Sequence, residues 1–144
     1  VLHYAGEAHA ESPHRIEVIR DAIDAYHFKH PIVHIEAPLA TQEQLMRVHP
    51  EHYINWLASV SPKKELIGID EDTVMNPHSL RAAYLAAGSV PLAVDEVLSG
   101  KHKAAFCCVR PPGHHAESEK AMGFCFFNNV AVGALHALHA HGLE

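Results

Sequence analysis

The sequence predicts an α/β fold in which helices flank a parallel β-sheet. Segments with helical periodicity alternate with short apolar segments, an order typical of layered α/β proteins. Residues 104–109 are apolar on both faces, as expected of a strand buried inside a parallel sheet. The 144 residues contain no repeat and no low-complexity linker, and 48% of them are hydrophobic. We therefore interpret 1–144 as one compact unit with its own core.

Composition disfavours a nucleic-acid or membrane protein. The formal net charge is −6, and no run of Lys and Arg offers the clustered positive charge that phosphates require. No apolar stretch approaches the roughly 20 residues of a membrane span. The chain has three cysteines, Cys107, Cys108 and Cys125. An odd number with two adjacent members does not fit a disulfide framework. We expect a cytoplasmic protein that binds neither nucleic acid nor membrane.

The first predicted helix follows Ser12, with Pro13 at its first helical position. Its apolar residues recur at helical spacing as far as about Phe28. Pro31 then ends the helix, because the residue before a proline disfavours the α conformation. Residues 32–35 are short and β-branched, which is typical of a strand.

Three further helices and a short extended piece are predicted before residue 104. Thr41 and Gln44 match a capping box at the start of a short helix, and a second short helix follows Pro50. Residues 66–69 form the extended piece. A long helix begins after residues 76–77. We expect a kink or break in this helix at Gly88 and Pro91, and its end at Gly100.

The loop after the predicted strand 104–109 is the best candidate for chemistry. In an open parallel sheet the ligand crevice lies beyond the carboxyl ends of the strands. Two prolines stiffen this loop, and Gly113 allows a tight backbone path just before His114 and His115. Histidine suits proton transfer because its ordinary pKa is about 6.5. We favour a functional role over histidines that only bond to backbone.

The segment 121–129, Ala-Met-Gly-Phe-Cys-Phe-Phe-Asn-Asn, follows this loop. Its aromatic residues could line an apolar channel, but on this segment alone a hydrophobic core is favoured. Asn128 or Asn129 is expected to cap a last helix that continues to Gly142.

Together, residues 110–116 (Arg-Pro-Pro-Gly-His-His-Ala) and 121–129 resemble the signature of the histone deacetylase family. The form of the signature in this sequence is similar to that of class II-like and bacterial deacetylase-like members. Ala10 departs from the proline usual before Glu11, a small change in a rim loop. The resemblance covers nearly the whole chain. Upstream segments that agree with it are 11–15, 45–53, 72–73 and 79–83.

This resemblance implies an arginase-deacetylase fold and zinc-dependent hydrolysis of an acetyl-lysine amide or of a related acetylated amine. His115 resembles the general base that later acts as general acid, and His114 resembles the residue that supports charge on the reacting oxygen. Gly123 and Phe124 resemble residues of the substrate tunnel. The glycine carbonyl would receive the substrate amide, and the ring would pack on the lysine methylenes.

Three further residues complete the expected site, and two of them have a purely structural alternative. Asp72 resembles a rim aspartate that holds the substrate backbone, but Asp70 is close, and a turn acid is an equal alternative. Arg15 resembles the arginine beside an internal acetate-release cavity, with a surface ion pair as the alternative. Cys125 is expected to be a buried, unreactive thiol.

No metal ligand is assigned in this chain. The family binds zinc through an Asp-x-His pair on the strand after the last helix predicted here, and through a later aspartate. His136, His139 and His141 are interpreted as a solvated helix face, because no cysteine or acid is seen to complete a ligand set. We therefore expect zinc in a longer parent protein, 1–144 being the N-terminal part of one deacetylase domain.

This N-terminal part is expected to be inactive alone. The alternative is a non-catalytic module that binds an acylated ligand or another chain. A truncated α/β unit would expose a sheet edge and apolar helix faces, which favours homo-oligomers or aggregation.

Overall fold

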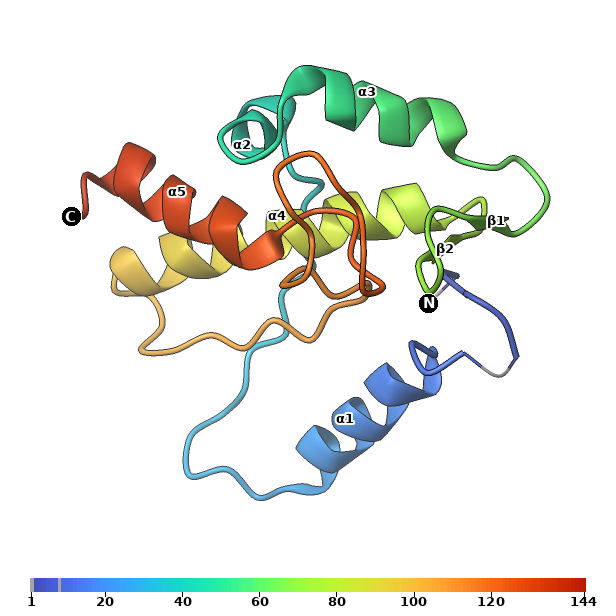
Figure 1. Ribbon diagram of the computed structural model, residues 1–144. Coiled ribbons are helices and arrows are strands. Elements are labelled where there is room, and N and C mark those ends of the chain that lie inside the picture. The colour runs from blue at the N-terminus through green and yellow to red at the C-terminus, as the bar shows by residue number, and fades with distance from the viewer. Residues whose placement is uncertain (1, 8) are drawn as a thin grey trace.

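The computed structural model describes residues 2–7 and 9–144. Helices dominate this part of the chain, and they surround one long central helix (Figure 1). The elements in order are α1 (His14–Ala25), α2 (Gln42–Met46), α3 (Glu51–Val60), β1 (Ile67–Gly68), β2 (Val74–Met75), α4 (Ser79–Leu98) and α5 (Asn129–His141).

The centre of the molecule is the contact between α4 and α5. Gly133 of α5 lies against Val90 of α4, so closely that a Cβ at residue 133 would be 2.2 Å from Val90 Cγ1. Figure 1 shows α5 beside the C-terminal half of α4, with α2 and α3 on the other side of the molecule from α1. No helix among residues 2–7 and 9–144 is long and apolar enough to cross a membrane.

The hydrophobic core joins the 121–129 segment to these helices. Phe126 and Phe127 are buried together with Leu45 of α2 and Leu57 of α3. Each such side chain contributes about 1.5–3 kcal/mol by leaving water. The hydroxyl of Tyr53 donates to the carbonyl of Phe126 at 2.7 Å, which satisfies both polar groups inside the core. The aromatic run is therefore mainly core.

Local capping chemistry is confirmed at several helix ends. The Thr41 side chain accepts from the Gln44 amide while the Gln44 side chain accepts from the Thr41 amide, a complete capping box. Asn128 caps α5 by accepting from the amide of Ala131. Gly142 ends α5 in the left-handed region, with φ of 64°.

The bounds of the first helix differ from the prediction. Helix α1 begins at His14 with Pro13 as its N-cap residue, and no side chain caps it, so Ser12 is not the cap. The helix ends at Ala25 rather than near Phe28, because Tyr26 is already extended, with φ −86° and ψ 132°. Periodic apolar spacing alone does not define where the backbone leaves the helical region.

The long helix also behaves differently from the prediction. Helix α4 runs without a break through Pro91, a buried residue whose lack of an amide proton costs the helix only one backbone hydrogen bond. Gly88 sits where residues 38–40 cross the helix, and a Cβ there would be 2.2 Å from the Pro38 carbonyl oxygen. The helix ends at Leu98, and Gly100 follows with φ of 77°, as expected for a left-handed end.

The predicted parallel sheet is not seen. In the described part of the chain the sheet is a single antiparallel pair, β1 and β2, with Ile67 opposite Met75 and Gly68 opposite Val74. Residues 104–109 and 32–35 form no strand, and Phe106 is 73% exposed. An apolar pattern reports suitability for burial, but a strand also needs a hydrogen-bonded neighbour. Neither segment has one among the described residues.

Candidate functional site

His114 and His115 lie side by side on the loop 110–120. Their ring centroids are 4.2 Å apart, and both side chains are exposed. The start of α5 holds this loop: the Asn128 side-chain amide donates to the carbonyl of Ala116 at 3.0 Å. Gly113 approaches the same helix start so closely that a Cβ would lie 2.5 Å from the amide nitrogen of Asn129. The loop can therefore present the two rings from a fixed backbone.

A tight hairpin lies against the second of these rings. Met122 and Cys125 exchange two backbone hydrogen bonds around Gly123 and Phe124. Both turn residues are left-handed, with φ of 56° and 68°, as a type I′ turn requires. Such a conformation costs a non-glycine residue about 1–2 kcal/mol. A Cβ at Gly123 would be 2.7 Å from Cγ of His115, so the glycine lets the hairpin touch the imidazole.

Thr73 fastens the hairpin to the neighbouring turn. Its buried hydroxyl accepts from the amide of Phe124 at 3.0 Å and donates to Oδ1 of Asp72 at 3.2 Å. His9 adds a second link, because Nε2 bonds to the Asp72 carbonyl and the ring packs edge-on against Phe124. Sequence reasoning assigned no role to Thr73 or His9. The pairing of Thr73 with Asp72 in the family-like segment was the signal available.

The two candidate rim acids have different surroundings. Oδ1 of Asp70 accepts from the amides of Asp72 and Thr73 at 3.1 and 2.7 Å, which makes Asp70 the acid that closes the turn. Partial burial would raise the pKa of Asp70, but the hydrogen bonds from Thr73 and Asp72 lower it. The carboxylate of Asp72 is exposed beside the hairpin. Of the two acids, Asp72 is therefore the one whose carboxylate is open to solvent.

A buried ion pair anchors the start of the loop. The guanidinium of Arg110 bonds to both carboxylate oxygens of Glu11 and, through Nη1, to the carbonyl of His3. Burial alone would raise the pKa of Glu11, but hydrogen bonds from His3 and Arg110 lower it to about 2. Arg15 lies 3.6 Å from Glu11 with 54% of its side chain exposed.

An apolar cavity of about 290 Å³ adjoins this ion pair, and its walls include Ile16, Leu85 and Val109 together with Arg110. Arg15 is not among the residues that line this cavity. Its role beside an acetate-release cavity stays a prediction.

His49 links the loop 110–120 to the start of α5 by hydrogen bonds. It is buried, its Nδ1 donates to the Ser118 carbonyl at 2.8 Å, and its Nε2 accepts from the Asn128 amide at 3.0 Å. Burial lowers the pKa of His49. Because Nε2 accepts from the Asn128 amide, the ring carries its proton on Nδ1 and serves both bonds. Cys125 is buried as predicted, with its thiol directed at the Gly123 carbonyl, and burial raises its pKa.

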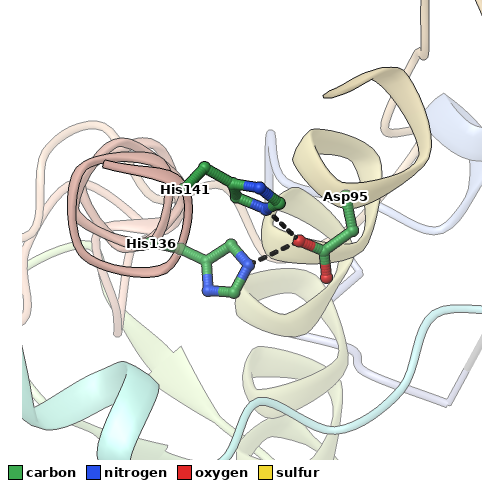
Figure 2. A group of neighbouring side chains, drawn as sticks. All are labelled: Asp95, His136 and His141. Carbon is green, nitrogen blue, oxygen red and sulfur yellow. Dashed lines mark hydrogen bonds and ion pairs between the residues drawn. The ribbon is translucent and has the colours of Figure 1, made fainter. Parts of the chain in front are cut away.

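A different group of side chains has metal-ligating geometry. Nε2 of His136 and Nε2 of His141 each lie 2.7 Å from Oδ1 of Asp95 (Figure 2). The expectation of a solvated face without an acid is wrong here, because His136 is buried and Asp95 of α4 faces it. His139 is exposed and outside the group, as expected. No sequence signal related Asp95 to a histidine 41 residues later.

Comparison with known proteins agrees with these motifs. A model of the histone deacetylase domain matches residues 9–144. This chain belongs to the histone deacetylase family. The crystal structure of the HDA15 HD domain superimposes with a TM-score of 0.86 at 36% sequence identity, covering 96% of this chain and 42% of that one. The structural match agrees with the predicted fold family, although the parallel sheet itself is not seen in the described residues.

Two relatives align with nearly the whole of this chain. A histone deacetylase-like amidohydrolase of Pseudomonas aeruginosa is 37% identical over 97% of this chain, and the human polyamine deacetylase HDAC10 is 34% identical over 96%. The chain spans only 37% and 21% of the lengths of these two relatives.

Proposed function

We propose that this chain forms part of an amide hydrolase that removes acetyl groups from acetyl-lysine. The observation that supports this most is the contact between the exposed His114–His115 pair and the left-handed hairpin at Gly123 and Phe124. This arrangement puts groups that move protons beside a backbone carbonyl and an aromatic ring. Hydrolysis of an amide at the end of a long, apolar side chain needs these groups: imidazoles for proton transfer, a hydrogen-bond acceptor for the amide and an apolar ring for the chain.

Each residue has a defined task in the proposal. The imidazole of His115 takes a proton from the attacking water and returns it to the leaving amine, while His114 supports the negative charge that develops on the acetyl oxygen. The ring of Phe124 packs on the lysine methylenes, and the carbonyl of Gly123 accepts from the substrate amide. The exposed carboxylate of Asp72 accepts from the substrate backbone at the rim.

Zinc belongs to this proposal for the whole domain, but the described residues do not supply its site beside the catalytic pair. In residues 2–7 and 9–144 the one group of three ligating side chains is on α4 and α5, whereas His114 and His115 are on the loop. We expect the 144 residues alone not to hydrolyse acetyl-lysine, and a longer protein that includes them to do so.

A small acetylated polyamine is the second candidate substrate. Two observations favour it: the similarity to the human polyamine deacetylase and the exposed acidic pair Glu71 and Asp72 beside the hairpin, which would attract a polycation. A cytoplasmic location, supported by three free cysteines, completes the proposal. So does self-association through residues 104–106, which are apolar and exposed and form no strand.

The test uses the longer protein with an acetyl-lysine peptide and an N-acetylated polyamine as competing substrates. We expect turnover of the peptide, and Asp72→Asn should raise its KM about tenfold through loss of one charged hydrogen bond. Glu71→Gln, a neighbouring exposed carboxylate, is the matched control and should leave this KM within twofold. Absence of turnover with both substrates would contradict the proposal and favour a non-catalytic module.

A further inference from the structure

Three metal-ligating side chains converge where α4 and α5 end. The Nε2 atoms of His136 and His141 approach one oxygen of Asp95, and the three ligand atoms lie within 4.8 Å of one another. Figure 2 shows both rings, carried by one helix, directed at the carboxylate of the other. We propose that Asp95, His136 and His141 bind a divalent transition-metal ion of the zinc class, independently of the catalytic chemistry.

The donor atoms select the class of ion. Two imidazole nitrogens and one carboxylate oxygen are a set that Zn²⁺ accepts with water in a further position, whereas Mg²⁺ and Ca²⁺ prefer oxygen ligands. Bonds of about 2.0–2.1 Å place neighbouring donors of a tetrahedral site about 3.3 Å apart. From 2.7 Å, the side chains must therefore open by roughly half an ångström.

The side chains have room for this movement, and the helices behind them do not need to move. Asp95 and His141 are 48% and 30% exposed, so both can shift toward solvent. Gly133, one turn before His136, already lets α5 lie in contact with Val90 of α4. The ion would consequently bind to a backbone arrangement that exists without it, which lowers the entropic cost of binding.

Arg47 opposes the ion and sets its affinity. The guanidinium only donates, so Nη1, 3.3 Å from Nδ1 of His136, requires that nitrogen to be an acceptor and leaves the ring proton on Nε2. A metal bound at Nε2 moves the remaining proton to Nδ1, where it meets the Arg47 donor. Arg47 must then turn away and keep only its ion pair with Glu43, 2.8 Å away. We therefore expect micromolar rather than nanomolar affinity.

The test is a Zn²⁺ titration of the purified chain against a chromogenic chelator, with Co²⁺ absorption spectra to report the ligand geometry. The wild type should bind one ion with micromolar affinity. His141→Ala and Asp95→Asn should each weaken this binding at least tenfold. His139→Ala is the matched control on the same helix and should bind as the wild type does. Far-UV circular dichroism checks that each variant keeps its helices.

Arg47→Gln gives the sharpest readout because its effect has the opposite sign. Glutamine removes the positive charge and offers a carbonyl oxygen to Nδ1–H, so this variant should bind Zn²⁺ severalfold more tightly. Equal losses in His139→Ala and His141→Ala would overturn the proposal, because binding would then be spread over the surface histidines. No binding at micromolar Zn²⁺ in the wild type and in Arg47→Gln would also overturn it.

Discussion

The chain carries two histidine pairs that are built in different ways. His114 and His115 are neighbours in sequence on a loop, and their surroundings are backbone: a left-handed hairpin and the start of α5. His136 and His141 are five residues apart on a helix, and both turn toward one carboxylate. The loop pair leaves its rings open to solvent, whereas the helix pair directs two nitrogens to one point. Proton transfer suits the first arrangement and ion binding the second.

Both pairs depend on a glycine that allows a close approach. Gly123 brings the hairpin to His115, and Gly133 brings α5 to Val90 of α4. The charged anchors differ. The loop is anchored by the buried pair of Glu11 and Arg110, whereas Asp95 is about half exposed. Low pH and glycine-to-alanine substitutions should therefore affect the two regions differently.

The largest expected effect on stability is acid sensitivity at the loop anchor. The pKa of Glu11 is lowered from 4.5 to about 2, so its contribution to stability is present above pH 4.5 and is lost as the pH falls toward 2. The shift corresponds to about 3 kcal/mol. Urea unfolding at several pH values should show a steeper loss for the wild type than for Glu11→Gln. Glu17→Gln, on an exposed helix face, is the control, and an unchanged pH slope in Glu11→Gln would contradict the account.

The next effect concerns the loop pair itself. Gly123→Ala would place a Cβ 2.7 Å from the His115 ring, so the imidazole must move. A displacement of about 1 Å can cost about a hundredfold in kcat/KM. Deacetylation by the longer protein measures this, while Zn²⁺ binding at Asp95 should not change. Wild-type activity in Gly123→Ala would mean that the hairpin does not position His115.

The reciprocal change, Gly133→Ala, acts on the helix pair. Its methyl group would overlap Val90 and force α5 away from α4, which should destabilise the chain by about 2 kcal/mol. Chemical denaturation measures the free energy of unfolding, and the same variant should bind Zn²⁺ more weakly. Unchanged stability would show that the two helices can separate without cost.

The smallest effect is expected at Thr73. Thr73→Val keeps the shape but removes the hydroxyl that links the hairpin to Asp72, which should cost about 1 kcal/mol of stability. The same substitution should raise the KM of the peptide more than it lowers kcat, because the rim loses its attachment. Thr41→Val affects only the cap of α2 and serves as the control for KM. An equal KM change in both variants would argue against the link.

Features with local causes could be predicted from the sequence. The capping box at Thr41 and the cap at Asn128 need only residues within one helical turn. The site residues on the loop and hairpin came from a family-like signature. What they contact could not be read from it, because the Thr73 link joins positions 51 residues apart.

Features that depend on partners could not be predicted. Residues 104–109 have the composition of a buried strand, yet burial is decided by neighbouring strands that the described residues do not provide. The pairing of Asp95 with His136 depends on the register between two helices, which no local pattern contains. The local effect of Pro91 predicts a kink or break, whereas α4 is continuous through this buried residue.

The most direct test of the central claim is the deacetylation rate of the longer protein with His115→Ala, measured beside His139→Ala. Both substitutions remove an exposed imidazole, but only His115 touches the hairpin. The account predicts a loss of about a hundredfold to ten-thousandfold in kcat for His115→Ala and none for His139→Ala. Equal rates in the two variants would contradict the assignment of proton transfer to the loop pair.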